Sequence, residues 1–379
     1  MSHGGHGLSR RSFINAGAAA GLGAASAAGL TACSGSGGKA AGPDRRKPGG
    51  RGLADTVLQA FRTHRLVGLG EAHNLQNHHD ALTLLLTDPR IPEVVDDIVV
   101  EFGNALYQPT IDRFIVGQPV ANADLRPVWR NTTQSPAATW DEPVYEQFYR
   151  TVRAVNAPLP PGRQIRVLLG DPPLDWSKIT NFDQLRAIAG PQRDIHPASV
   201  VRSQVLDKGH RALICYGLGH LTHGGSLAGL IERQTGERPY LIADFVPLAT
   251  DPGGLASRFS RYSQDTVIPT AGTWLGSADA GLFSPNTQGG RNGQQTNAWC
   301  GIRLGSLIDA ALYLGQPEEL TASWWNPAIF LDPVYWKELQ RRNALHPIPV
   351  NLGSYRQQDL PALFPLTKLP PSQECGTAP

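Results

Sequence analysis

The stretch Arg65-Leu-Val-Gly-Leu-Gly-Glu-Ala-His73 predicts the class of fold. Its short apolar run ends at Gly70 and is followed at once by polar residues, a pattern typical of a buried strand. Four similar runs follow along the chain, at residues 97–101, 163–170, 211–217 and 240–246. Helical patterns separate the strands, at residues 53–62, 80–86, 110–116, 144–155, 197–208 and 226–234. Strands that alternate with helices indicate an α/β domain with a mostly parallel central sheet and helices on both faces.

The domain is expected to span residues 53–350. Within it, residues 250–300 contain Gly-, Asn- and Gln-rich turns, which favour surface loops or a lid over the sheet. Residues 304–314 are apolar and are expected in the core, and residues 332–345 are expected to form a helix. The Pro-rich tail, 351–379, is expected to wrap the surface.

Polar residues follow four of the predicted strands. Glu71 and His73 come after the first strand, and Glu101 ends the second. Asp171 follows the third strand, and His220 follows the fourth. Because the carboxyl ends of parallel strands meet at one edge of a sheet, where ligands bind, these side chains are expected to converge.

Such a cluster suits general acid–base chemistry, since an imidazole exchanges protons near pH 7 and a neighbouring carboxylate fixes its tautomer. Alternatively, Glu71, His73, Glu101 and His220 could ligate a divalent metal. The adjacent pair His78-His79 begins the helix after the first strand and adds a candidate cofactor-binding pair. Neither a GxSxG nucleophile elbow nor an HExxH zinc motif is present.

The charge balance argues against a nucleic-acid partner. The 379 residues include 34 Lys and Arg and 32 Asp and Glu, and removal of Arg10 and Arg11 leaves a neutral remainder. A nucleic-acid binder requires a basic face. Four cysteines are too few for a disulfide scaffold, and whether Cys300 and Cys375 pair stays open at this point.

The N-terminus predicts export. Ser9-Arg-Arg-Ser-Phe-Ile-Asn15, followed by an Ala- and Gly-rich stretch, resembles a twin-arginine signal. Leu30-Thr-Ala-Cys33 resembles a lipobox, in which Cys33 would be lipidated. Residues 1–33 are therefore expected to be a signal and residues 34–52 a flexible linker. A protein with this arrangement would be anchored by lipid to the outer face of the cytoplasmic membrane.

Three ordered motifs carry a family resemblance: Gly70-Glu-Ala-His73, Val100-Glu-Phe-Gly103 and Gly217-Leu-Gly-His220. With them the chain resembles the superfamily of erythromycin esterases, ChaN-like haem-binding uptake proteins and Tiki/TraB-type proteins. The esterase resemblance implies hydrolysis of an ester or amide, with His73 as general base, Glu71 and Glu101 orienting it, and His220 assisting. The Gly170-Asp171 step is similar to one in the esterases.

The other branches of the superfamily imply different chemistry. The Tiki-like resemblance implies metal-assisted hydrolysis through Glu71, His73, Glu101 and His220. The ChaN-like resemblance implies a lipoprotein that binds haem or iron without turnover, a function that the His78-His79 pair fits best. The sequence therefore predicts a hydrolase with a small-molecule substrate, with haem binding as the alternative.

Overall fold

The structure is a computed structural model that describes residues 50–137, 139–284, 287–289, 295–356, 363–368 and 375. By its internal contacts the chain divides into residues 1–45 and 46–379, and every described residue belongs to the second unit. The predicted signal, the lipobox Cys33 and most of the linker 34–52 lie outside the described residues. None of the helices that the described residues form is long and apolar enough to cross a membrane.

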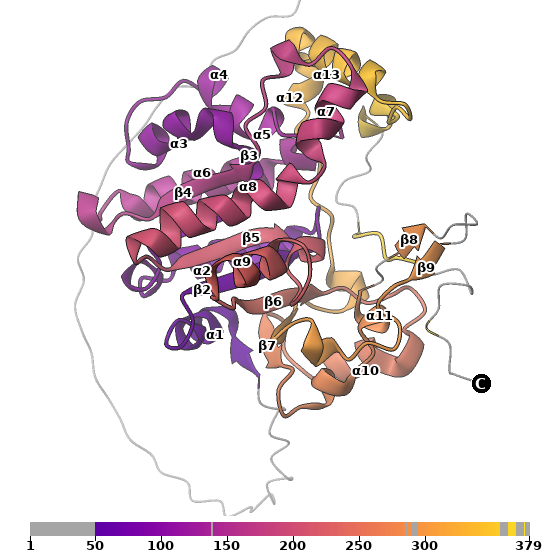
Figure 1. Cartoon of the computed structure of the whole chain (residues 1–379). Helices are drawn as coiled ribbons and strands as arrows, with labels where there is room; N and C mark the ends of the chain where they lie inside the picture. Colours follow the sequence, from indigo (N-terminus) through magenta and orange to yellow (C-terminus); the bar gives the residue numbers. More distant parts are fainter. Residues whose placement is uncertain are drawn as a thin grey trace, which may run out of the picture. The chain divides into compact units, whose positions relative to one another are not determined.

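An eight-stranded sheet forms the centre of the second unit and confirms the predicted α/β class (Figure 1). Its order is β1-β7-β10-β6-β2-β5-β3-β4, and the six strands from β10 to β4 are parallel. The five predicted strands are all present, as β2 (Leu66–Glu71), β3 (Asp97–Asn104), β4 (Arg166–Asp171), β5 (Ala212–Gly217) and β6 (Tyr240–Phe245). β2 lies between β5 and β6, so the segment quoted at the outset forms the middle of the sheet.

Helices cover both faces of the sheet, because successive side chains of each strand point to opposite sides. Val67 and Leu69 of β2 face a core completed by α1, α2, α3 and α6, whereas Leu66 faces a core completed by α8, α9, α10 and α11. Figure 1 shows α8 and α9 in front of the strands. The helices of the first core are α1 (Leu53–Ala60), α2 (Gln76–Thr87), α3 (Gln108–Ile115) and α6 (Pro143–Asn156). Those of the second core are α8 (Gln192–Val200), α9 (Leu227–Thr235), α10 (Leu255–Phe259) and α11 (Ala280–Phe283).

Outside these two layers, further helices lie along the chain. They are α4 (Asn122–Leu125), α5 (Pro127–Arg130), α7 (Phe182–Ala189), α12 (Ala328–Leu331) and α13 (Pro333–Leu345). The predicted helix at 332–345 corresponds to α13. Asp332 caps it by accepting a hydrogen bond from the backbone N–H of Tyr335, and Pro333 occupies its first turn.

The segment 250–300 differs from the loops or lid expected from its composition. It contributes β7 (Thr266–Pro269) to the central sheet, antiparallel to its neighbour β10 (Ala310–Tyr313). It also contains α10, α11 and the strands β8 (Thr287–Gly289) and β9 (Gln295–Asn297), which form a separate small sheet. The linker was predicted to extend to residue 52, but Arg51 and Gly52 form β1 (Arg51–Gly52), which pairs with β7. Short runs such as Thr266–Pro269 lack a periodic signal that identifies a strand.

Two further differences concern the later part of the chain. The helix expected from residue 197 begins five residues earlier, at Gln192, with Pro197 inside it, and continues through a π turn and a 3-10 turn to Lys208. The prediction placed Pro197 at the first helical position, where proline is favoured. Cys300 and Cys375 form a disulfide, which ties the tail to the domain.

Candidate active site

A pocket of about 480 Å³ opens at the carboxyl ends of β2, β5 and β6. Its lining includes Glu71 at the end of β2 and His73 after it, Gly217 at the end of β5 and His220 after it, and Asp244 near the end of β6. Glu101 of β3 contacts His73, Gly217 and His220. The structure thus brings together Glu71, His73, Glu101 and His220, which lie up to about 150 residues apart in the sequence. Their roles in function stay predictions.

Glu71 and His73 form a close carboxylate–imidazole pair. His73 Nδ1 lies 2.5 Å from Glu71 Oε1, which also accepts a hydrogen bond of 3.1 Å from the hydroxyl of Tyr145. The Glu71 side chain is buried, whereas the His73 side chain is 33% exposed and meets Trp140 edge-on. A Cβ on Gly217 would lie 2.7 Å from His73 Nε2, so a glycine is required for the imidazole to approach β5 this closely.

The electrostatics of this pair fix its resting protonation. Burial acts to raise the pKa of Glu71, but the hydrogen bond and positive charge of His73 outweigh it and lower that pKa to about 2. Burial acts to lower the pKa of His73, but the carboxylates of Glu101 and Glu71 raise it to about 9. His73 is therefore an imidazolium at neutral pH. A protonated imidazole donates a proton, so this protonation favours an acid over the general base expected from the sequence, and the role of His73 stays a prediction.

Glu101 contacts both imidazoles of the site, His73 and His220. Its Oε2 accepts a hydrogen bond of 2.8 Å from the backbone N–H of Gly217 and lies 3.8 Å from His73 Nε2. Its Oε1 accepts a hydrogen bond of 2.8 Å from Gln134 Nε2 and a short one from Arg193. Glu101 is only 3% exposed, and these donors hold both of its carboxylate oxygens in fixed positions.

His220 forms a second carboxylate–imidazole pair. Its Nδ1 lies 2.6 Å from Asp194 Oδ1, and its Nε2 lies 3.5 Å from Glu101 Oε1. A carboxylate on Nδ1 selects the tautomer in which Nε2 is the acceptor when the ring is neutral. The site therefore contains two imidazoles, each with a carboxylate on Nδ1 and each with Nε2 toward Glu101.

His78 and His79 lie beneath this layer and are 3% and 4% exposed. His78 Nδ1 bonds Asp244 at 3.0 Å, and the Nε2 atoms of His78 and His79 lie 3.8 and 3.9 Å from Glu71 Oε2. Burial acts to lower the pKa of His78, but Asp244 raises it, whereas burial lowers the pKa of His79 to about 3. Neither residue is among those that line the pocket. Their Nε2 atoms lie near Glu71 Oε2 but beyond hydrogen-bond distance.

Asp171 also lies outside the pocket lining. It is 3% exposed, and its carboxylate accepts hydrogen bonds from the backbone N–H of Thr133 at 2.9 Å and from the Thr133 hydroxyl at 2.5 Å. Burial raises the pKa of Asp171 to about 7. Its contacts fix the loop that carries Gln134, so the structure gives it a positioning contact where the sequence suggested a catalytic one.

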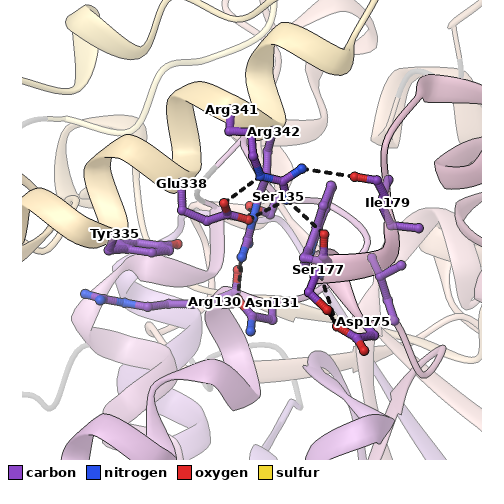
Figure 2. A network of polar contacts seen from close by, with 12 residues as sticks. Arg130, Asn131, Ser135, Asp175, Ser177, Ile179, Tyr335, Glu338, Arg341 and Arg342 are labelled. Carbon is purple, nitrogen blue, oxygen red and sulfur yellow. Dashed lines mark hydrogen bonds and ion pairs between the residues drawn. The ribbon is translucent and has the colours of Figure 1, made fainter.

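The loop at residues 130–135 is held by the distant helix α13 (Figure 2). Arg342 of α13, 3% exposed, donates to the carbonyl of Arg130 at 2.9 Å and to Ser135 Oγ at 3.0 Å. It also donates to Asn131 Oδ1 at 2.7 Å and to Glu338 at 2.8 Å. Through Gln134, this buried guanidinium influences the position of Glu101.

Metal and haem binding stay predictions of the sequence. Among the described residues, no group of three or more His, Cys, Asp or Glu side chains is arranged to hold a metal ion. A carboxylate on Nδ1 is also the usual partner of a metal-ligating histidine, so the contacts of His73 and His220 do not argue against a metal. The buried pair His78-His79 presents no nitrogen to the pocket lining, so it does not fit axial ligation of a haem bound there.

Several residues of the site were missed in the sequence. Arg193 and Asp194 lie in the first turn of α8, ahead of the proline that was expected to begin the helix. Asp244 could have been found, because it lies at the end of the fifth predicted strand just as Glu71 and Glu101 end the first and second. Gln134 lies in an irregular loop and carries no signal in the sequence.

Comparison with known proteins gives likenesses in structure alone. No family model matches the chain, and no curated protein matches it. A Bacillus cereus protein of known structure is similar at 12% identity and a TM-score of 0.49, over 72% of this chain and 92% of that one. ChaN of Campylobacter jejuni, solved with cofacial haem, is similar at 11% identity and a TM-score of 0.32, over 51% of this chain and 86% of that one. The type III effector HopBA1 is similar at 12% identity and a TM-score of 0.33, over 53% of this chain and 88% of that one. Likenesses at this level assign neither a family nor an activity.

Proposed function

We propose that this chain is a hydrolase that cleaves an ester or amide by general acid–base catalysis of water attack. The observation that carries the proposal is the convergence of two carboxylate-backed imidazoles, His73 and His220, on Glu101 at a pocket. Paired groups of this kind supply the acid and the base that hydrolysis requires.

The two imidazoles take different roles. His220, with Asp194 on Nδ1, removes a proton from water through Nε2 as the water oxygen attacks the carbonyl carbon. His73, an imidazolium at neutral pH, stabilises the negative charge that develops on the carbonyl oxygen and donates its Nε2 proton to the leaving group. The bond between the carbonyl carbon and the leaving group then breaks.

Water completes the proton balance. After one turnover His220 holds the proton from water and His73 lacks one. Exchange with water restores both imidazoles: His220 releases the proton to water, and His73 takes one up, while Glu101 keeps its contact with both Nε2 atoms. The net reaction consumes one water and releases an acid and an alcohol or amine.

Hydrolysis of a panel of p-nitrophenyl esters and anilides by the purified protein tests this proposal. His220→Asn and His73→Gln should each reduce kcat by about 100-fold or more. His210→Asn is the matched control, because His210 also pairs with a carboxylate, Asp97, at 2.9 Å, but does not line the pocket. The absence of turnover across the panel, or full activity in His220→Asn, would contradict the proposal.

Haem titration distinguishes the alternative function. On the hydrolase proposal, added haem gives no stoichiometric Soret band. A stoichiometric band that disappears in His73→Ala would support haem binding in place of hydrolysis.

We also propose that the protein is exported and anchored by lipid at Cys33. Ser9-Arg-Arg-Ser-Phe-Ile-Asn15 and Leu30-Thr-Ala-Cys33 support this proposal, at a spacing that suits a signal and its cleavage site. Mass spectrometry of the mature protein should find an acylated N-terminus at Cys33. An unprocessed N-terminus in the cellular protein would contradict the anchor.

A further inference from the structure

We infer that the substrate carries a compact apolar group, which binds a built hydrophobic wall on the β6 side of the pocket. This inference rests on the proposed function and names the class of substrate. The imidazoles of the lining follow β2 and β5, whereas Val246, Leu248, Phe283 and Phe364 come from the chain after β6 and form an apolar part of the lining. An apolar wall beside a polar, reactive one binds a substrate with the same division.

The order of the sheet sets the distance between Glu101 and the wall. Glu101 is on β3, and two strands, β5 and β2, separate it from β6. At the usual spacing between strands, β3 and β6 lie roughly 14 Å apart. His73 and His220 follow the two intervening strands, so they lie closer to the wall than Glu101 does, and the space between them and the wall suits a short acyl chain or one aromatic ring. A pocket of about 480 Å³ accommodates a molecule of this size.

The wall is held in place from two parts of the chain. Val246 and Leu248 directly follow β6, and Phe283 ends α11. Phe364 comes from the C-terminal segment 363–368, whose backbone is bonded at two points. Phe364 N donates to the carbonyl of Leu320 at 2.8 Å, and Ala249 N donates to the carbonyl of Thr367 at 3.0 Å.

The position of Phe364 makes it the residue to test. It is half-buried, which leaves part of its ring exposed to the pocket. Leu366, two residues further along the same segment, is also half-buried and packs against the core, but it is not among the lining residues. The two positions therefore form a matched pair that separates loss of the wall from loosening of the segment.

Binding of a series of linear primary alcohols, which have no acyl bond to hydrolyse, tests the inference without turnover. Ligand-observed NMR should show affinity rising about 15-fold from butan-1-ol to hexan-1-ol, since each buried methylene is worth about 4-fold. Phe364→Ala should reduce this gain to about 3-fold or less, Phe364→Leu should restore most of it, and Leu366→Ala should leave it unchanged.

Two outcomes would overturn the inference: an affinity that does not depend on chain length in the wild-type protein, or an unchanged gain in Phe364→Ala. The alcohol series and ester turnover can fail separately. If no ester or anilide is hydrolysed but the alcohol series behaves as expected, the proposed hydrolase function fails and the apolar wall stands.

Discussion

His73 and His220 present their Nε2 atoms to the two oxygens of one carboxylate, at 3.8 Å from Glu101 Oε2 and 3.5 Å from Glu101 Oε1. His73 follows β2 and His220 follows the neighbouring strand β5, at positions 147 residues apart. Because a different carboxylate contacts each Nδ1, the two rings differ in environment although they share a partner. On the proposed mechanism, this difference assigns the acid to one ring and the base to the other.

Asp194→Asn should reduce kcat by between about 100-fold and 10,000-fold while the protein stays folded. Asparagine can donate to Nδ1 and so favours the tautomer with the hydrogen on Nε2, which removes the base. Ester hydrolysis and circular dichroism measure the two effects. Asp183→Asn is the control, because Asp183 is exposed and pairs only with Arg186 in its own helix. An Asp194→Asn protein as active as the control would rule out this tautomer-fixing role.

The pH profile of kcat/KM should fall above about pH 9, with a limiting slope of −1. His73 must be protonated to donate to the leaving group, and its pKa is raised to about 9, with burial opposing and the carboxylates of Glu101 and Glu71 raising it. The same raised pKa means that its interactions stabilise the fold fully below pH 6.5 and are lost as the pH rises through 9. Activity that keeps rising beyond pH 10 would show that His73 acts as a base after all.

Glu71→Gln should lower the pKa of His73 by about 1 to 3 units, because a neutral amide replaces the buried carboxylate on Nδ1. Titration of the imidazole by NMR measures the shift directly, without a substrate. Tyr145→Phe is the matched control, since it removes another hydrogen bond to Glu71 Oε1 but no charge. Equal shifts in the two variants would indicate that the charge of Glu71 is not the cause.

Arg342→Lys should destabilise the fold by about 2 to 4 kcal/mol, because lysine cannot reproduce the several directed bonds of this buried guanidinium. Arg341→Lys, at a neighbouring residue that is 40% exposed, should cost about 1 kcal/mol or less. Urea unfolding compares the two. The Arg342 variant should also lose kcat where it stays folded, because loop 130–135 positions Gln134. Equal midpoints for the two variants would refute this role.

Reduction of the Cys300–Cys375 disulfide should destabilise the protein by about 2 to 4 kcal/mol, since the bond closes a loop with a sequence separation of 75. Unfolding with and without dithiothreitol measures the change. A double variant, Cys300→Ser with Cys375→Ser, should start at the lower stability and show no response to the reductant. A response in the double variant would assign the effect to another group.

The sequence predicted the sheet better than the site. Strands such as 212–217 are buried on both faces, so they consist of continuous apolar runs that can be recognised in the sequence. The order of these strands in the sheet explains the convergence of Glu71, Glu101 and His220. The partners of these residues were harder to find. Asp194 reaches His220 only because α8 begins before Pro197, and the protonation of His73 depends on distances that no spacing in the sequence reveals.

The place of β2 between β5 and β6 has a consequence for biosynthesis. A nascent chain that has left the ribosome only as far as residue 200 contains β2 but neither of its neighbours in the sheet. The middle of the sheet can therefore close only after about residue 245 has emerged, and a translation product that stops short of that point would expose an unpaired hydrophobic strand. Because the sheet assembles late, chaperones would be needed most while the middle of this domain is being synthesised.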